Sequence, residues 1–118
     1  MEIKVFDAEY RFMCIVWDRE PITSPLLVML CDEEFGWKKS TTYTVIKRLS
    51  ERGALKNENT VVTSLVSRLQ VQKYESELIL AKTFDNSLPT FITAFLQDKK
   101  LSQEDAKLIE KMIKDATK

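Results

Sequence analysis

Apolar residues recur at helical spacing in the first part of the chain, and this spacing predicts two helices. The first covers residues 7–18 and ends before Pro21, because the residue that precedes a proline disfavours the helical conformation. Its apolar face consists of Phe12, Met13, Val16 and Trp17. The second begins with Ser24 as the N-cap and Pro25 at the first helical position, and it ends near Gly36. Because it is apolar nearly all round, we expect it inside a bundle.

A third helix and a hairpin follow. Ser40 is the predicted N-cap of a helix over residues 41–52, and Gly53 is its predicted C-cap glycine. The inward-facing residues are expected to be Val45, Ile46 and Leu49. The hairpin is predicted from a short strand at 54–56, a turn at 57–59 and the strongest β run of the chain, VVTSLV, at 61–66. Three helices followed by a hairpin are typical of a winged helix-turn-helix.

The rest of the chain has the pattern of three more helices. Residues 67–84 are helical, Ser87 and Pro89 start another helix, and Ser102 opens a last one over about residues 102–116 with a capping-box pattern. The predicted fold is therefore mainly α with a small β-hairpin. A winged helix-turn-helix domain at residues 1–66 is followed by a helical dimerisation region at residues 67–118.

Dimerisation is expected because each C-terminal helix has a narrow apolar stripe, and one short chain offers little core to cover all three. The alternative is that these stripes pack within one chain. The residues of the predicted interface are Tyr74, Leu78, Ala81, Phe84, Phe91, Phe95, Ile109 and Met112.

The composition supports helices and excludes several kinds of chemistry. Glycine occurs twice and proline three times, which is too few turn-formers for a fold of many hairpins. The absence of histidine removes the commonest general base and metal ligand. Cys14 and Cys31 form no CxxC pair and are predicted to be free buried thiols. We expect no catalytic residues, no metal, no cofactor and no membrane segment, and a protein located in the reducing cytoplasm.

The net charge is zero, but the charges are unevenly distributed. Residues 1–35 carry 3 basic and 8 acidic side chains, whereas residues 36–56 carry 6 basic and 1 acidic. This concentrates the positive field at the third helix, which has the dimensions to enter the major groove of DNA. A solvated basic helix face is the alternative. The predicted DNA-contacting residues are Lys38, Lys39, Ser40, Thr41, Thr42, Tyr43, Thr44, Lys47 and Arg48.

Short segments along the whole chain carry a family resemblance. They are DAEY at 7–10, VW at 16–17, PIT at 21–23, GWK at 36–38, STTYTVIKRL at 40–49, GAL at 53–55 and LSQE at 101–104. In this order and spacing the chain resembles the penicillinase-repressor family of the BlaI/MecI type. The resemblance implies a homodimeric repressor that binds a palindromic operator, such as one that controls a beta-lactam-response gene.

The resemblance also implies a route of inactivation. In the family, a membrane sensor-protease pathway cleaves the repressor within the second C-terminal helix, before a phenylalanine in an Asn-Phe context. The corresponding bond here joins Ala94 to Phe95, so the phenylalanine is kept and the asparagine is not. The chain also has no cysteine after Cys31, whereas the copper-responsive branch carries C-terminal Cys-x-Cys motifs.

The wing and the overall charge leave other functions open. The predicted wing at 57–60 lacks the basic and aromatic residues typical of the family and contains Glu58, so its contacts with DNA are expected to be weak or absent. A winged-helix protein-interaction module that has lost DNA binding is the alternative function. An enzyme is a third class, but the carboxylate pairs Asp32/Glu33 and Glu104/Asp105 are typical of helix-end charge.

Overall fold

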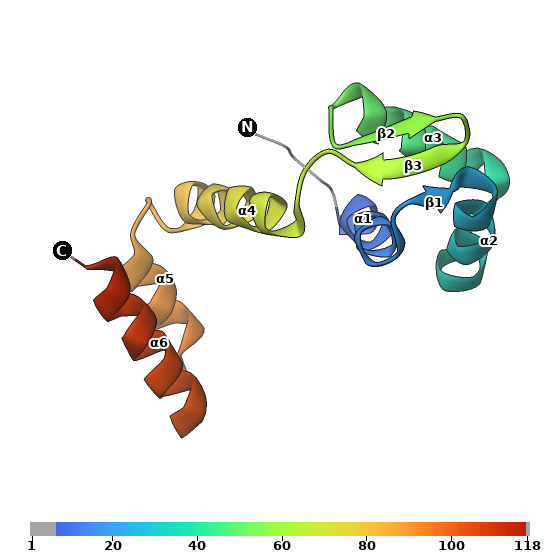
Figure 1. Cartoon of the computed structure of the whole chain (residues 1–118). Coiled ribbons are helices and arrows are strands. Elements are labelled where there is room, and N and C mark those ends of the chain that lie inside the picture. Colours follow the sequence, from blue (N-terminus) through green and yellow to red (C-terminus); the bar gives the residue numbers. More distant parts are fainter. Residues whose placement is uncertain (1–6, 118) are drawn as a thin grey trace. The chain divides into compact units, whose positions relative to one another are not determined.

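A computed structural model describes residues 7–117, which form six helices and three strands (Figure 1). In order these are α1 (Asp7–Arg19), β1 (Ile22–Thr23), α2 (Ser24–Phe35), α3 (Lys39–Glu51), β2 (Leu55–Glu58), β3 (Val61–Ser64), α4 (Arg68–Thr83), α5 (Leu88–Phe95) and α6 (Gln103–Ala116). The chain divides into two compact units, Met1–Glu77 and Leu78–Lys118, and the division falls inside α4. The parts of the two predicted domains at 1–6 and 118 lie outside the described residues.

The N-terminal unit has one apolar core, built from the residues whose periodicity predicted it. Helices α1, α2 and α3 and the hairpin enclose Phe12, Val16, Leu27, Leu49 and Val62, each with no exposed surface. In Figure 1, α3 lies against β2 and α1 lies against β3. The prediction of a mainly α fold with a small β-hairpin is confirmed.

The sheet contains one strand that the sequence did not predict. Its order is β1-β3-β2 and both pairings are antiparallel, with Ile22 opposite Val62 in the first. In the hairpin Glu58 pairs with Val61, so Asn59 and Thr60 form a two-residue turn with φ of 52° and 66°. This is the backbone of a turn that matches the twist of the flanking strands. Strand β1 has only two residues, too few for an alternating pattern to reveal it.

Two predictions about α2 are wrong. The N-cap is Thr23, whose hydroxyl accepts a hydrogen bond from the Leu26 N–H at 3.4 Å, and Ser24 is already the first helical residue. The helix also does not lie inside a bundle, because Met29 is 52% exposed and only three of its residues are buried. Helix α2 packs mainly on α3 and β1, and its other side is exposed. Its predicted end holds, since Gly36 adopts the left-handed conformation that a C-cap needs.

Two carboxylates attach α1 to distant parts of the unit. Glu9, which is almost fully buried, forms a bidentate pair with Arg52 just after α3, with N–O distances of 2.9 and 2.6 Å. At the other end of α1, the Glu20 carboxylate accepts hydrogen bonds from the backbone N–H and the hydroxyl of Ser64, at 2.8 and 2.9 Å. Charge-assisted bonds of this geometry hold the ends of α1 against α3 and β3.

The first turns of α4 belong to the N-terminal unit. Val71 is fully buried and joins the same core as Phe12 and Leu49. The helix begins with a reciprocal cap, because the Ser67 hydroxyl accepts from the Gln70 N–H at 3.0 Å while the Gln70 side chain accepts from the Ser67 N–H at 2.7 Å. The compact unit therefore continues past residue 66, where the sequence placed the end of the first domain.

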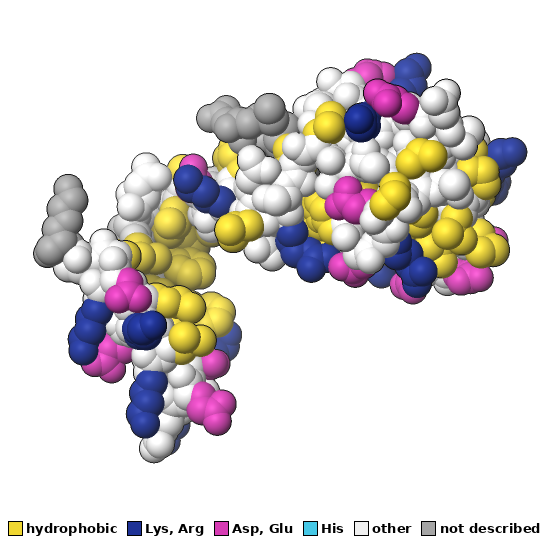
Figure 2. Space-filling view, viewed as in Figure 1, with side chains coloured by type: hydrophobic (Ala, Val, Ile, Leu, Met, Phe, Trp, Pro, Cys, Tyr) yellow, Lys and Arg dark blue, Asp and Glu magenta, His cyan; other side chains and the backbone are white. Residues whose placement is uncertain are grey.

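The C-terminal unit has predicted caps and almost no interior. Ser87 and Ser102 accept hydrogen bonds from the backbone N–H groups of Thr90 and Asp105, as their sequence patterns predict. No side chain of α5 or α6 is buried. Figure 2 shows hydrophobic side chains open to the surface over these two helices. They include Leu88, Ile92, Phe95, Leu108, Ile109, Met112 and Ile113, all at least 40% exposed.

We predict that Arg52→Ala lowers the free energy of unfolding by about 2–4 kcal/mol, because it removes the bidentate partner of a carboxylate held away from water. Urea unfolding followed by circular dichroism measures the loss. Arg19→Ala is the matched control, since Arg19 is an exposed arginine at the end of α1. It should cost less than about 1 kcal/mol. Equal losses in the two variants would contradict a structural role for the Glu9–Arg52 pair.

Candidate nucleic-acid interface

The start of α3 differs from the sequence prediction in a way that bears on anion binding. The helix begins at Lys39, its N-cap is Lys38, and no side chain caps it, so the prediction that Ser40 is the cap is wrong. The first N–H groups of a helix have no partner inside the helix. In α3 these N–H groups lie beside Lys38 and Lys39, and the first turn contains no acidic residue. Backbone dipole and side-chain charge therefore both favour an anion at this end.

One face of α3 is exposed and the other is buried. Thr42, Val45, Ile46 and Leu49 face the core, each with 6% or less of its surface exposed. The exposed face carries most of the predicted contact residues: Lys38, Lys39, Ser40, Thr41, Thr44, Lys47 and Arg48. Among the described residues, none of these four basic side chains takes part in an ion pair. Their charge is therefore not neutralised by the carboxylates of residues 7–117.

Two of the predicted contact residues lie elsewhere. Thr42 is fully buried, so the prediction that its side chain faces DNA is wrong. It packs beside Cys31 of α2, and burial raises the pKa of that thiol to about 11, with the neighbouring Thr42 side chain acting in the opposite direction. Tyr43 is half-buried against the core, and its hydroxyl lies 3.4 Å from the Ser24 hydroxyl. These two side chains join α2 to α3 and leave the outer face to their neighbours.

Thr44 is exposed, but part of its hydrogen-bonding capacity is used within the helix. Its hydroxyl donates to the Ser40 carbonyl at 2.9 Å. A threonine hydroxyl has one proton and two lone pairs, so Thr44 keeps an acceptor and a methyl group for an external contact. A thymine methyl or a base amino group suits such a side chain.

Arg52, which the sequence counted with the basic segment, belongs to the structure rather than to the surface charge. Its guanidinium is paired with Glu9 at 2.6 Å. Sequence reasoning missed this pair because its members are 43 residues apart and no local pattern connects them. The pair fixes the C-terminal end of the helix whose N-terminal end carries the lysines.

The wing is weakly charged. Glu58 is exposed and its nearest cation is Lys56 on the same strand, at 3.9 Å. The turn residues Asn59 and Thr60 are both exposed and uncharged. A hairpin with one exposed carboxylate and one exposed ammonium group gives little net attraction for phosphate. The electrostatic asymmetry of the N-terminal unit therefore comes from α3.

Other kinds of site find no support in the part of the chain that the structure describes. No three His, Cys, Asp or Glu side chains gather there in a way that could hold a metal ion. None of the helices formed by residues 7–117 combines the length and apolarity that a membrane crossing needs. Both cysteines are free; Cys31 is buried and Cys14 only half-buried.

Comparisons with protein families and with solved structures each found a match. Residues 6–115 match the family profile described as penicillinase repressor. The solution structure of Bacillus licheniformis BlaI, in its monomeric form in complex with the blaP half-operator, is 24% identical with a TM-score of 0.52, over 58% of this chain and 88% of that chain. The solution structure of the DNA-binding domain of the repressor BlaI is 24% identical with a TM-score of 0.51, over the same shares. At this identity the likeness shows the winged-helix fold. No curated protein sequence matches the chain.

The burial of Cys31 beneath α3 predicts a difference in reactivity between the two thiols. Because its pKa is about 11, Cys31 stays protonated at pH 8, and the thiolate is the form that alkylating reagents attack. Iodoacetamide should therefore modify Cys14 first and reach Cys31 only after denaturation, as mass spectrometry can show. The Cys14→Ser variant isolates the buried thiol. Rapid alkylation of the native Cys14→Ser protein would contradict the packing of α2 on Thr42.

Proposed function

The chain belongs to the penicillinase repressor family, and we propose that it is a homodimeric transcriptional repressor that binds a palindromic operator through the exposed face of α3. Members of this family are DNA-binding transcriptional regulators, and the chain is not an enzyme. A cytoplasmic location is part of the proposal. The observation that carries it is the exposed basic face of α3, whose lysines and arginine have no acidic partner among the described residues.

The proposed contacts divide between the DNA backbone and the bases. Lys38 and Lys39, at the uncapped start of α3, are placed to neutralise phosphates together with the helix dipole. Thr41, Thr44 and Lys47 follow Lys39 along the exposed face, where a helix in the major groove meets base edges. The complex of BlaI with a half-operator supports this proposal, since that protein has the same fold and binds DNA.

The proposed dimer uses the apolar side chains of residues 67–118. No side chain of α5 or α6 is buried in the described chain, and stable helices normally bury their apolar face. Phe84, Phe91 and Phe95 form a row with ring centroids 5.2 and 6.0 Å apart. Together with Ile109 and Met112 on α6, they offer a surface for the same helices of a second copy. The other residues of the proposed interface are Tyr74, Leu78 and Ala81.

A sensor-protease pathway is the proposed source of the inducing signal. Ala94 and Phe95 are the last two residues of α5, and both are exposed. A helix of eight residues with no buried side chain opens at low cost, and a protease needs an extended backbone. The operator of a beta-lactam-response gene is the proposed target, by analogy with the family.

We expect Lys47→Ala to weaken operator binding about tenfold, because it removes one direct contact of α3 with the DNA. Glu58→Ala on the wing is the matched control and should change the affinity little, or raise it slightly by removing a like charge. Fluorescence anisotropy with genomic fragments selected by the protein measures both variants. The titrations are repeated at low and high salt, because counterion release makes DNA binding fall steeply with salt.

Two results would contradict this assignment. A large loss of affinity in Glu58→Ala would show that the wing contributes to binding. The absence of any salt-dependent binding, to selected fragments and to random duplex DNA alike, would favour a winged-helix module that binds proteins instead.

The full chain should sediment as a dimer at micromolar concentration. Replacing Ile109 and Met112 together by lysine should yield a monomer, because charges on both sides of a shared interface repel and resist desolvation. Lys111→Ala, on the opposite side of α6, should leave the dimer intact. Sedimentation equilibrium distinguishes the species, and a monomeric wild-type chain would overturn the proposed assembly.

Cleavage between Ala94 and Phe95 should inactivate the repressor by breaking the dimer. The N-terminal unit has its own core and should stay folded after the cut. Each protomer then reads one half-site and loses the affinity that tethering two readers provides. A protease site engineered at this position allows circular dichroism, sedimentation and operator binding to be compared before and after the cut. A cut protein that remains dimeric and still holds the operator would contradict the mechanism.

A further inference from the structure

Side chains of α1 hold the first turns of α4 at a place that is separate from the DNA-facing helix. The Arg68 guanidinium pairs with Asp18 at 2.9 Å and lies over the Trp17 ring, 5.4 Å from its centroid. The Trp17 indole N–H donates to the Val66 carbonyl at 2.9 Å, just before α4 begins. Arg68 of α4 is thus held by both the Asp18 carboxylate and the Trp17 ring of α1.

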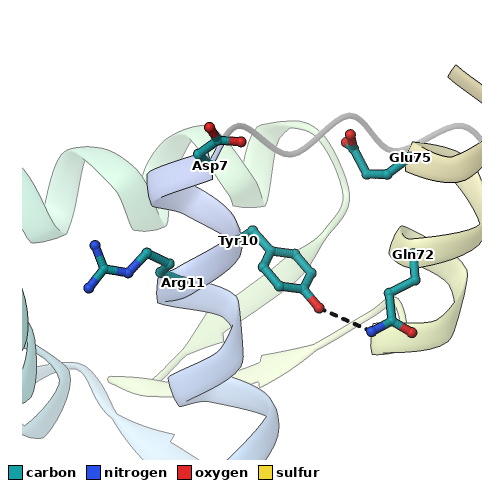
Figure 3. Close-up of a pocket in the computed structure, with 5 residues that line it drawn as sticks. All are labelled: Asp7, Tyr10, Arg11, Gln72 and Glu75. Atoms are coloured by element: carbon teal, nitrogen blue, oxygen red, sulfur yellow. Dashed lines mark hydrogen bonds between the residues drawn. The ribbon is translucent and has the colours of Figure 1, made fainter. Parts of the chain in front are cut away.

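A second point of attachment lies one turn further along α4. The Gln72 amide donates to the Tyr10 hydroxyl at 3.2 Å, and Figure 3 shows the two side chains meeting between the helices. The Tyr10 ring packs edge-on against Trp17, with centroids 5.7 Å apart. We call the contacts of Arg68 with Asp18 and Trp17, and of Gln72 with Tyr10, the α1–α4 latch.

Among residues 7–117, the latch joins the two helices at discrete points beside a hollow. A cavity of about 440 Å³ lies there, lined by Asp7, Tyr10, Arg11, Gln72 and Glu75 (Figure 3). Among the described residues of α4, Val71 is the one whose side chain is buried. We therefore expect the loss of one latch contact to loosen the angle between α1 and α4.

We propose that the α1–α4 latch fixes the direction in which α4 leaves the DNA-reading unit, and that Arg68 is thereby a positioning residue for the spacing of operator half-sites. This rests on the proposed dimeric repressor. The core and the Glu9–Arg52 pair fix α3 relative to α1, and the latch fixes α4 relative to α1. The direction of α4 relative to the reading helix is then set, and α4 itself carries Tyr74, Leu78 and Ala81 of the proposed dimer interface.

Half-site spacing is sensitive to such an angle. Each base pair inserted between two half-sites moves one of them by about 3.4 Å and rotates it by about 34° around the DNA axis. A dimer whose readers are rigidly attached accepts one spacing well, whereas loosely attached readers accept several. The latch therefore determines how sharply the dimer distinguishes operators that contain identical half-sites.

The test is a series of palindromic duplexes whose half-sites are separated by different numbers of base pairs. The wild-type chain should bind its best spacing about tenfold more tightly than spacings two base pairs away, a difference comparable to one mismatched base pair. Arg68→Ala and Asp18→Asn should each reduce this preference to about threefold or less and leave binding to a single half-site unchanged. The double variant should behave like either single one, because both remove the same contact.

Lys73→Ala is the control, since it removes one exposed positive charge from the same helix without touching the latch. It should keep the wild-type spacing preference. An unchanged preference in Arg68→Ala would overturn the inference, and so would an equal loss in Lys73→Ala. A fall in half-site affinity would assign Arg68 to stability or to direct DNA contact instead, and would overturn it as well.

A measurement without DNA separates the latch from the proposed function. Spin labels at Arg19→Cys and Glu77→Cys, in a chain with both native cysteines replaced and diluted with unlabelled protein, report the distance between α1 and the part of α4 that belongs to the N-terminal unit. The distribution should be narrow in the wild-type background and clearly broader in Arg68→Ala. Equally narrow distributions would overturn the latch even if the protein represses as proposed. A broadened distribution in a chain that fails to bind DNA would support the latch and contradict the function.

Discussion

Helix α3 can serve as a reading surface because one of its faces is buried without exception. Thr42, Val45, Ile46 and Leu49 occupy positions i, i+3, i+4 and i+7, and all four lie in the core. Their burial fixes the rotation of the helix about its axis, so the identity of the exposed residues follows directly. A rotation by one residue would turn Lys47 toward the core, where a buried ammonium group without a paired charge is costly. The chemistry of the outer face thus depends on the packing of the inner one.

The polar contacts of α1 complement this packing. A unit of this size has a small core, which constrains the angles between helices less strongly than a large one. Glu9 with Arg52, Glu20 with Ser64, and Arg68 with Asp18 each connect α1 to a different element. Helix α1 has no exposed basic face resembling that of α3, yet it sets the placement of α3, the hairpin and α4. Its role in the proposed function is to hold these three elements in place.

Local patterns predicted most of the fold, and they failed where a distant partner decided the outcome. The helices, the caps at Ser87 and Ser102 and the Gly36 terminus follow from short-range chemistry. Thr42 continues the buried stripe of Val45 and Leu49, but a polar side chain at such a position is ordinarily expected at the surface. Strand β1 exists because β3 offers it a partner, and Thr23 rather than Ser24 caps α2 because β1 fixes the backbone there. The ion pairs of Arg52 and Arg68 span 43 and 50 residues, which no periodicity can detect.

The C-terminal unit, whose helices bury no side chain, has a consequence for the amount of protein in a cell. Under the proposed assembly, its helices gain their stability from a second copy, so their folding equilibrium depends on protomer concentration. At low abundance this region is largely open, and open segments are where proteases cut. Degradation would then fall hardest on dilute protein and least on concentrated protein. The lifetime of the protein would therefore increase with its own concentration. As a result, the amount of repressor in the cell would change more abruptly than its rate of synthesis.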